Sequence, residues 1–239
     1  MKRELEALEN DVKAELRSSA TSIADPITDG VVDVDLYLAS SPKMLWILKE
    51  PVDDVVNGVP SGGGWSMAKD ILAVGKFGNK PPFAPIAYVA YSVFNGFKKW
   101  GDIDYVTKNP AVKAAVKHIA HININKMPAL PTSGGTDFGR IYSQNRNLLL
   151  RQIYTLSPDI LIFGSTIGFF LEDLGLKREE FKPIGSLKYC VKGQRLFIDA
   201  FHPSQWTQVS PIDYVDEIVA TIKEQSPVLP RPLSEISIS

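Results

Sequence analysis

The chain has 239 residues, with 26 Lys and Arg against 27 Asp and Glu, which gives a net charge of −1. Its 44% hydrophobic and 22% charged residues exclude a wholly disordered chain, a collagen and a coiled coil. The single Cys excludes an internal disulfide, a cysteine-based zinc site and an iron–sulfur cluster, and fits a reducing compartment. The start, MKRELEALEND, lacks the apolar core of a secretory signal, and no stretch approaches about 18 apolar residues. We therefore expect a cytoplasmic protein without a membrane segment.

The chain begins with a predicted amphipathic helix over residues 3–20, whose other face carries Glu and Lys. The apolar positions of this helix are Leu5, Leu8, Val12 and Leu16. Residues 21–43 contain several Pro and Gly breakers and are interpreted as a loop. We divide the chain into a helix and linker over 1–30, an α/β domain over 31–225, and a Pro/Ser-rich tail over 226–239.

Short apolar runs alternate with helical patterns along the rest of the chain. The predicted strands are 44–48, 118–123, 159–163 and 196–200, and the predicted helices are 85–99, 109–117, 141–156, 166–174 and 211–224. This alternation is typical of a parallel sheet covered by helices. We expect a three-layer α/β/α fold with a central, mainly parallel four-stranded sheet, preceded by the N-terminal helix. Residues 187–191 form a predicted hairpin with the last strand, which adds an antiparallel edge.

Polar residues follow each predicted strand. Ligands of open α/β sheets bind outside the carboxyl ends of the strands, so these residues are the first candidates for a site. Glu50 follows the first strand, Asn123 ends the second, Ser165 follows the third, and His202 follows the fourth. A carboxylate, an amide and an imidazole therefore converge on one edge of the predicted sheet.

Four segments, in this order, resemble the successive motifs of the uracil-DNA glycosylase superfamily. They are LWILKEP, IAHININKMP, DILIFGST and DAFHPSQW, and the similarity spans about residues 43–225. The His-Pro-Ser triplet in the last segment is the strongest single piece. The resemblance implies an α/β/α domain that removes uracil or a related damaged pyrimidine from DNA without a cofactor or a metal.

The resemblance also implies roles for particular residues. Glu50, beside Pro51, holds the place of the residue that activates water, and Asn123 matches the Asn that reads the flipped base. His202 matches the His that stabilises the departing base, with Ser204 in the same substrate-binding triplet. Trp65 is the preferred aromatic platform for the base, and Phe83 is the alternative.

The chemistry of these side chains fits the implied reaction. Cleavage of an N-glycosidic bond produces a cation-like sugar and an anionic base. A carboxylate can orient water and favour the cation, and a His donor can stabilise the negative charge on the base. An Asn carboxamide offers one donor and one acceptor, which match N3–H and O4 of uracil. A base inside a duplex must first be flipped out, and Trp206 is a possible wedge.

The first motif departs from the family pattern, because Leu48-Lys49-Glu50 replaces the usual glycine-led turn. Glu is one methylene longer than Asp and would hold water differently. Lys49 alternatively forms an ion pair with Asp53 or Asp54. A second function hypothesis is therefore an altered superfamily member that binds nucleic acid or a nucleobase ligand without turnover, and a third is a hydrolase of free nucleosides.

Further signals have more ordinary interpretations. The run Gly62-Gly63-Gly64 either approaches a phosphate or is a bare loop. His118 and His121 are three residues apart, but on a strand they would face opposite sides, so we expect no metal site there. Ser165 is expected to cap the helix that follows it. Arg140, Arg146 and Arg151 form a possible phosphate-binding patch on one helix.

Overall fold

A computed structural model describes residues 1–19, 24–79, 81–130, 134–205 and 207–229. The described part contains a mixed sheet with the strand order β1-β5-β2-β6-β9-β8-β7. Its strands are β1 (Gly30–Val31), β2 (Met44–Leu48), β5 (Ala120–Asn123), β6 (Ile160–Gly164), β7 (Lys182–Ile184), β8 (Leu187–Lys192) and β9 (Arg195–Ala200). A separate ribbon pairs β3 (Val55–Val56) with β4 (Val59–Pro60). The predicted wedge Trp206 and most of the predicted tail lie outside the described residues.

The four predicted strands form the parallel centre of this sheet. Strands β5, β2, β6 and β9 pair in parallel, in that spatial order. The predicted hairpin is confirmed, since β8 pairs antiparallel with β9. The prediction of four strands is nevertheless wrong, because the described sheet has seven. Strands β1 and β7, at the two edges, have only two and three residues, too few for a periodic apolar pattern to develop.

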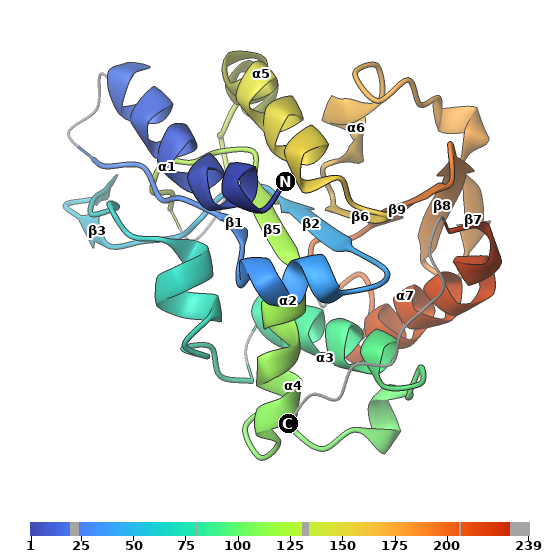
Figure 1. Ribbon diagram of the computed structural model, residues 1–239. Coiled ribbons are helices and arrows are strands. Elements are labelled where there is room, and N and C mark those ends of the chain that lie inside the picture. The colour runs from blue at the N-terminus through green and yellow to red at the C-terminus, as the bar shows by residue number, and fades with distance from the viewer. Residues whose placement is uncertain (20–23, 80, 131–133, 206, 230–239) are drawn as a thin grey trace.

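Helices cover the sheet, as Figure 1 shows, with α1 and α5 on one side and α3 and α7 on the other. The α-helices are α1 (Lys2–Ser19), α2 (Val34–Ala39), α3 (Phe83–Phe94), α4 (Pro110–Ala114), α5 (Phe138–Leu156), α6 (Ile167–Phe170) and α7 (Pro211–Gln225). Single turns of 3₁₀-helix are η2 (Trp100–Asp102), η3 (Ala115–His118), η4 (Arg178–Glu180) and η5 (Ser226–Val228), and η1 (Met67–Leu72) is a π-helix. None of the helices in the described ranges has the length and apolar character needed to cross a bilayer.

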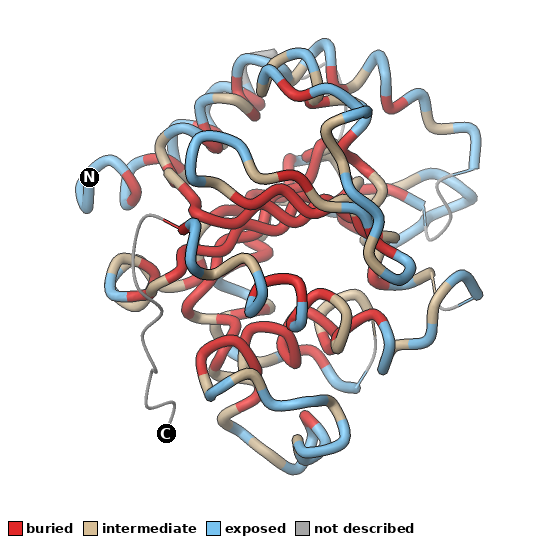
Figure 2. Tube along the Cα trace, turned by 90° about the vertical axis from the view of Figure 1, so that its right-hand side faces the viewer, coloured by how far each residue is buried: buried red, intermediate tan, exposed pale blue. Residues whose placement is uncertain are grey.

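Alternation along the buried strands divides the apolar core in two. Trp46 and Leu48 of β2 pack with the side that contains α3 and α7, whereas Leu45 and Ile47 pack with the side that contains α1 and α5. All five residues of β2 are buried for this reason, since both faces of the strand are covered. The buried residues form a continuous band through the sheet (Figure 2).

The segment interpreted as a loop, residues 21–43, contains two short elements. Gly30–Val31 pairs antiparallel with β5, and Val34–Ala39 is a helix whose N-cap, Asp33, accepts a hydrogen bond from Leu36 N at 3.0 Å. Both elements are too short to show a period in the sequence. The predicted strand 118–123 starts later, at Ala120, because the preceding residues form η3.

Candidate functional site

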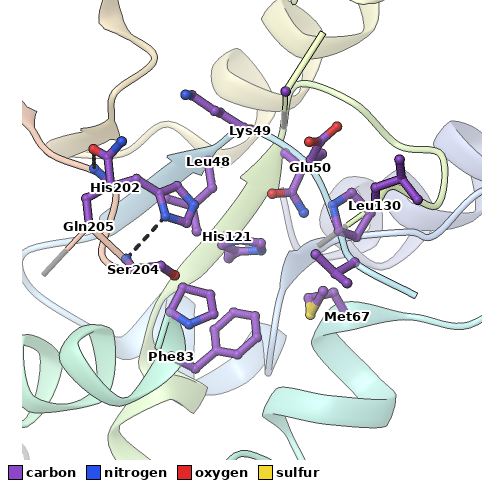
Figure 3. A pocket seen from close by; sticks show the side chains of 15 residues that line it. Leu48, Lys49, Glu50, Met67, Phe83, His121, Leu130, His202, Ser204 and Gln205 are labelled. Carbon is purple, nitrogen blue, oxygen red and sulfur yellow. Dashed lines mark hydrogen bonds between the residues drawn. The ribbon is translucent and has the colours of Figure 1, made fainter. Parts of the chain in front are cut away.

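A cavity of about 440 Å³ opens at the carboxyl ends of the central strands (Figure 3). This volume lies within the range of small-molecule sites in proteins. The lining residues come from β2 and β5 and the segments after them, from the starts of η1 and α3, and from the segment after β9. They are Leu48, Lys49, Glu50, Pro51, Val52, Met67, Pro82, Phe83, His121, Asn123, Leu130, Gly134, His202, Ser204 and Gln205.

Five of the six predicted site residues line this one cavity. They are Glu50, Pro51, Asn123, His202 and Ser204. Trp65 is not among the lining residues; its indole Nε1–H donates to Asp53 Oδ2 at 2.7 Å. Phe83, the alternative aromatic residue, does line the cavity, because it begins helix α3 directly beneath it.

His202 is held in one orientation and one tautomer by the chain that follows it. The backbone N–H of Ser204 donates to His202 Nδ1 at 3.2 Å, so Nδ1 is the acceptor and the proton of the neutral ring is on Nε2. Burial, with the charge of Lys49 acting in the same direction, lowers the pKa of His202 to about 4. At neutral pH the ring is therefore an uncharged hydrogen-bond donor through Nε2.

The turn after β6 supports His202 from behind. Ser165 Oγ accepts a hydrogen bond from the backbone N–H of His202 at 2.9 Å, and Ser165 has a left-handed backbone with φ 58°. The predicted helix-capping role is wrong, because the N-cap of α6 is Thr166. A Cβ on the neighbouring Gly164 would lie 2.5 Å from Leu48 Cδ2 and 3.2 Å from Pro203 Cδ. The absence of a side chain there lets β6 and the His202 segment approach each other.

Asn123 ends β5 and is only 2% exposed. Its backbone N–H donates to Asp29 Oδ2 at 2.7 Å, which fixes the end of the strand. Asp29 is itself buried and accepts from Lys126 Nζ at 2.6 and 2.8 Å and from Gln152 Nε2 at 3.1 Å. Burial lowers the pKa of Lys126, and the Asp29 carboxylate opposes that effect. The sequence does not predict this ion pair, because its partners are far apart along the chain.

Glu50 is positioned by the loop that follows β5. Asn125 Nδ2 donates to Glu50 Oε2 at 3.4 Å, while Asn125 Oδ1 accepts from Met127 N at 3.0 Å. The backbone N–H of Asn125 also donates to Lys49 O at 2.8 Å, so the two strand-end loops are joined. Asn125 thus connects the carboxylate to the segment that carries Asn123.

Lys49 does not form the ion pair that the sequence suggested. Within the described residues it makes no salt bridge with Asp53 or Asp54, and its Nζ lies 5.6 Å from the centre of the Phe138 ring. Asp53 instead accepts from Trp65 and from Gly63 N. The positive charge of Lys49 is therefore not paired with these two carboxylates, and it acts on His202 in the cavity.

The glycine run packs against the protein itself. Gly62, Gly63 and Gly64 all have positive φ, and a Cβ on Gly63 would lie 1.8 Å from the backbone oxygen of Asp25. Gly63 N donates to Asp53 Oδ2, and Gly64 N donates to Pro26 O at 3.2 Å. These two amides already have acceptors, so the loop interpretation fits them better than a phosphate cradle.

His121 lines the cavity, although the sequence drew attention to it only as a metal ligand. It lies two residues before Asn123 on β5, so both side chains are on the same face. Its ring is 1% exposed and meets Phe83 edge to face, with the ring centres 5.6 Å apart. His118 is in η3, where its Nδ1 lies 3.1 Å from Ser40 Oγ. The spacing of His121 and Asn123 is the signal that could have placed His121 in the site.

Comparison with known proteins gives no family for this chain: no protein-family model matches the sequence, and no curated protein matches it significantly. Among the residues that the structure describes, no three His, Cys, Asp or Glu side chains gather as a metal site. The cavity and its hydrogen bonds are therefore the basis for assigning a function.

Proposed function

We propose that the protein is a DNA base-excision glycosylase that hydrolyses the bond between deoxyribose and uracil or a related damaged pyrimidine. The proposed substrate is a flipped nucleotide in DNA, and the reaction needs water but no cofactor. Helices on both sides of a mainly parallel sheet support the three-layer α/β/α architecture of the superfamily that the motifs resemble.

The observation that carries the proposal is the state of His202. A neutral imidazole whose Nδ1 accepts from Ser204 N has its donor, Nε2–H, available for a ligand. When the glycosidic bond breaks, negative charge develops on the carbonyl oxygens of the departing pyrimidine. A neutral donor fixed in place before the reaction stabilises that charge at no cost in reorganisation.

Glu50 and Asn123 complete the proposed reaction from the other walls of the cavity. The oxygen of a water molecule bonds to C1′ as the C1′–N bond breaks, and the electron pair of that bond leaves with the base. Glu50 accepts the proton of the water and favours the positive charge on the sugar. Asn123 hydrogen-bonds the base edge through its donor and acceptor, and Phe83 supplies an aromatic surface for the ring.

The test is cleavage of an oligonucleotide that contains one uracil, as a single strand and as a duplex, with abasic sites detected by alkaline strand scission. We expect cleavage by the wild type and a loss of about 10²- to 10³-fold in Glu50→Gln and in His202→Ala. Glu224→Gln, an exposed position on α7, is the matched control and should cleave like the wild type. Equal product from the wild type and from His202→Ala would overturn the proposal.

A second candidate, a ligand-binding protein without turnover, is favoured by the charges on α5. Arg146 pairs with Asp173, and Arg151 pairs with Glu15 at 2.6 Å, so two members of the predicted phosphate patch are neutralised. This candidate requires that uracil binds in the cavity, that Glu50→Gln leaves the affinity unchanged, and that no oligonucleotide or free deoxyuridine is cleaved. Turnover of free deoxyuridine alone would instead indicate a nucleoside hydrolase.

A further inference from the structure

The His121 ring is a buried polar group that the protein itself does not satisfy. Neither Nδ1 nor Nε2 has a hydrogen-bond partner among the described residues, although the side chain is 1% exposed. The ring meets Phe83 edge to face, and that neighbour offers no oxygen or nitrogen. A buried group of this kind destabilises a fold unless something else bonds to it.

The cavity is the place from which such a partner can come. His121 lines it, and Figure 3 shows the ring near the middle of the lining residues, between Phe83 and Glu50. His121 precedes Asn123 by two residues on the same face of β5. Its side chain is therefore the next one along that face, further from the carboxyl end of the strand and deeper in the cavity. A ligand that Asn123 binds by one edge therefore presents its innermost atoms to His121.

Two comparisons within the core separate His121 from other buried polar side chains. Trp46 Nε1, Tyr214 Oη and Gln152 Oε1 also lack partners among the described residues, but none of these three residues lines the cavity. His118 is buried in the preceding turn and has Ser40 as a partner. Within the described chain, His121 combines two unpartnered ring nitrogens with a position on the cavity wall.

We propose that His121 is a specificity-determining residue that donates a hydrogen bond to a carbonyl oxygen on the edge of the bound base that faces away from the sugar. Asn123 and His121 then both hydrogen-bond this edge of the base, with Asn123 at the end of β5 and His121 deeper in the cavity. The substrate class is a base with an oxo group at that edge, such as uracil. This inference rests on the proposed function, since it takes the ligand to be a nucleobase.

The ring has the right protonation state for this role. Burial lowers the pKa of His121 to about 4, with Lys126 acting in the same direction and Asp29 opposing it. The imidazole is therefore neutral at pH 7 and carries one N–H donor and one acceptor nitrogen. A carbonyl oxygen can accept from both Asn123 and His121, because it has two lone pairs.

The test compares two free bases, uracil and pyrimidin-2-one, which lacks the oxygen at C4 and the hydrogen on N3. Their affinities are measured by calorimetry for the wild type, His121→Leu and His121→Gln. We expect the wild type to prefer uracil, His121→Leu to lose about tenfold of that preference, and His121→Gln to recover part of it through its amide donor. A packing role alone would lower both affinities together and leave their ratio unchanged.

His118→Leu is the matched control, because it removes a buried His from the same segment without touching the cavity wall. It should lower stability but keep the wild-type ratio of the two affinities. In the same samples, ¹⁵N NMR of the imidazoles should show the His121 signals moving on addition of uracil and staying in place with pyrimidin-2-one.

The outcomes distinguish this inference from the proposed function. If the wild type cleaves the uracil oligonucleotide but His121→Leu keeps the wild-type ratio, the role of His121 is overturned and the glycosylase proposal stands. If uracil binds in a His121-dependent manner and no oligonucleotide is cleaved, the glycosylase proposal fails and the role of His121 stands. A wild type that does not prefer uracil overturns the role of His121.

Discussion

Two groups of buried polar side chains meet at the carboxyl end of β5, and they differ in what satisfies them. The first, the Lys126 cluster, consists of Lys126, Asp29 and Gln152. Its two charged groups are bonded to each other, and Asp29 also to Gln152 Nε2, at 2.6 to 3.1 Å, and only Gln152 Oε1 lacks a partner among the described residues. The second is the cavity wall formed by His121 and Asn123, where neither nitrogen of His121 has a partner among the described residues. Asp29 connects the two, because it accepts from the backbone N–H of Asn123.

The difference indicates that the two neighbouring groups have separate roles, one in stabilising the fold and one in binding a ligand. A charge removed from water is tolerated only when it is paired, so the Lys126 cluster holds the end of β5 in place. The residues of the cavity wall are held by that support and leave their hydrogen-bonding capacity for a ligand. Substitutions on the two sides should therefore affect different properties of the protein.

The largest expected effect is loss of stability on breaking the buried ion pair. Lys126→Met leaves the Asp29 carboxylate buried without its cation, which should lower the free energy of unfolding by about 3–5 kcal/mol. Urea denaturation at pH 7 measures the change. Lys126→Met combined with Asp29→Asn should recover part of the loss, because no unpaired charge then remains and the Asn side-chain oxygen can still accept from the backbone N–H of Asn123.

Arg151→Met is the matched control for that experiment. Arg151 pairs with Glu15 at 2.6 Å and both side chains are 46% exposed, so its loss should cost less than about 1 kcal/mol. A similar cost for Lys126→Met would show that the buried pair contributes no more than a surface pair, and the proposed support of β5 would be wrong.

The next effect is acid destabilisation that originates in the cavity wall. His121 and His202 each have a pKa lowered to about 4, whereas an unfolded His titrates near 6.5. As the pH falls from about 6.5 to 4, the unfolded chain binds protons that the folded protein does not, so the free energy of unfolding decreases. Above about pH 6.5 these groups add no pH dependence. The fully buried His121 should account for roughly 2–3 kcal/mol of the loss.

The contribution of His121 is measured by difference, because carboxylates also titrate in acid. Urea denaturation from pH 7.5 to 4.5 should show a shallower decline for His121→Leu than for the wild type. Parallel curves for the two proteins between pH 6.5 and 5 would contradict a neutral, buried His121.

The centre of the fold and three of the key side chains are predictable from the sequence because both depend on local patterns. Buried parallel strands are short apolar runs, and their carboxyl ends meet at one edge, so the strand-end positions of Glu50, Asn123 and His202 predict that these residues converge. The structure brings all three to one cavity. Their catalytic roles stay a prediction.

Features that depend on distant partners are not predictable in the same way. Lys126 gives no local sign that it is buried, since Asp29 precedes it by 97 residues. The sequence favours Trp65 over Phe83 as the aromatic platform, but it does not show the path of the loop that carries Trp65. In the structure the Trp65 indole donates to Asp53 instead of lining the cavity. A serine such as Ser165 suits a helix cap, whereas its hydroxyl bonds to His202 from across the sheet edge.

The smallest expected effect on stability comes from Gly164→Ala, which changes the packing next to the cavity and removes none of its polar groups. Gly164→Ala adds a Cβ 2.5 Å from Leu48 Cδ2, 3.2 Å from Pro203 Cδ and 3.5 Å from His202 Cα, so the side chains at the cavity must shift. Stability should fall by about 1–2 kcal/mol, because the Leu48 tip is flexible but the Pro203 ring is not. The affinity for uracil should fall about tenfold as His202 moves, while Gly101→Ala, with no atom within 4 Å of its new Cβ, should change neither. If Gly164→Ala lowered stability and left uracil affinity intact, the position of His202 would not depend on the close approach of β6, and Ser165 would be the contact that holds it.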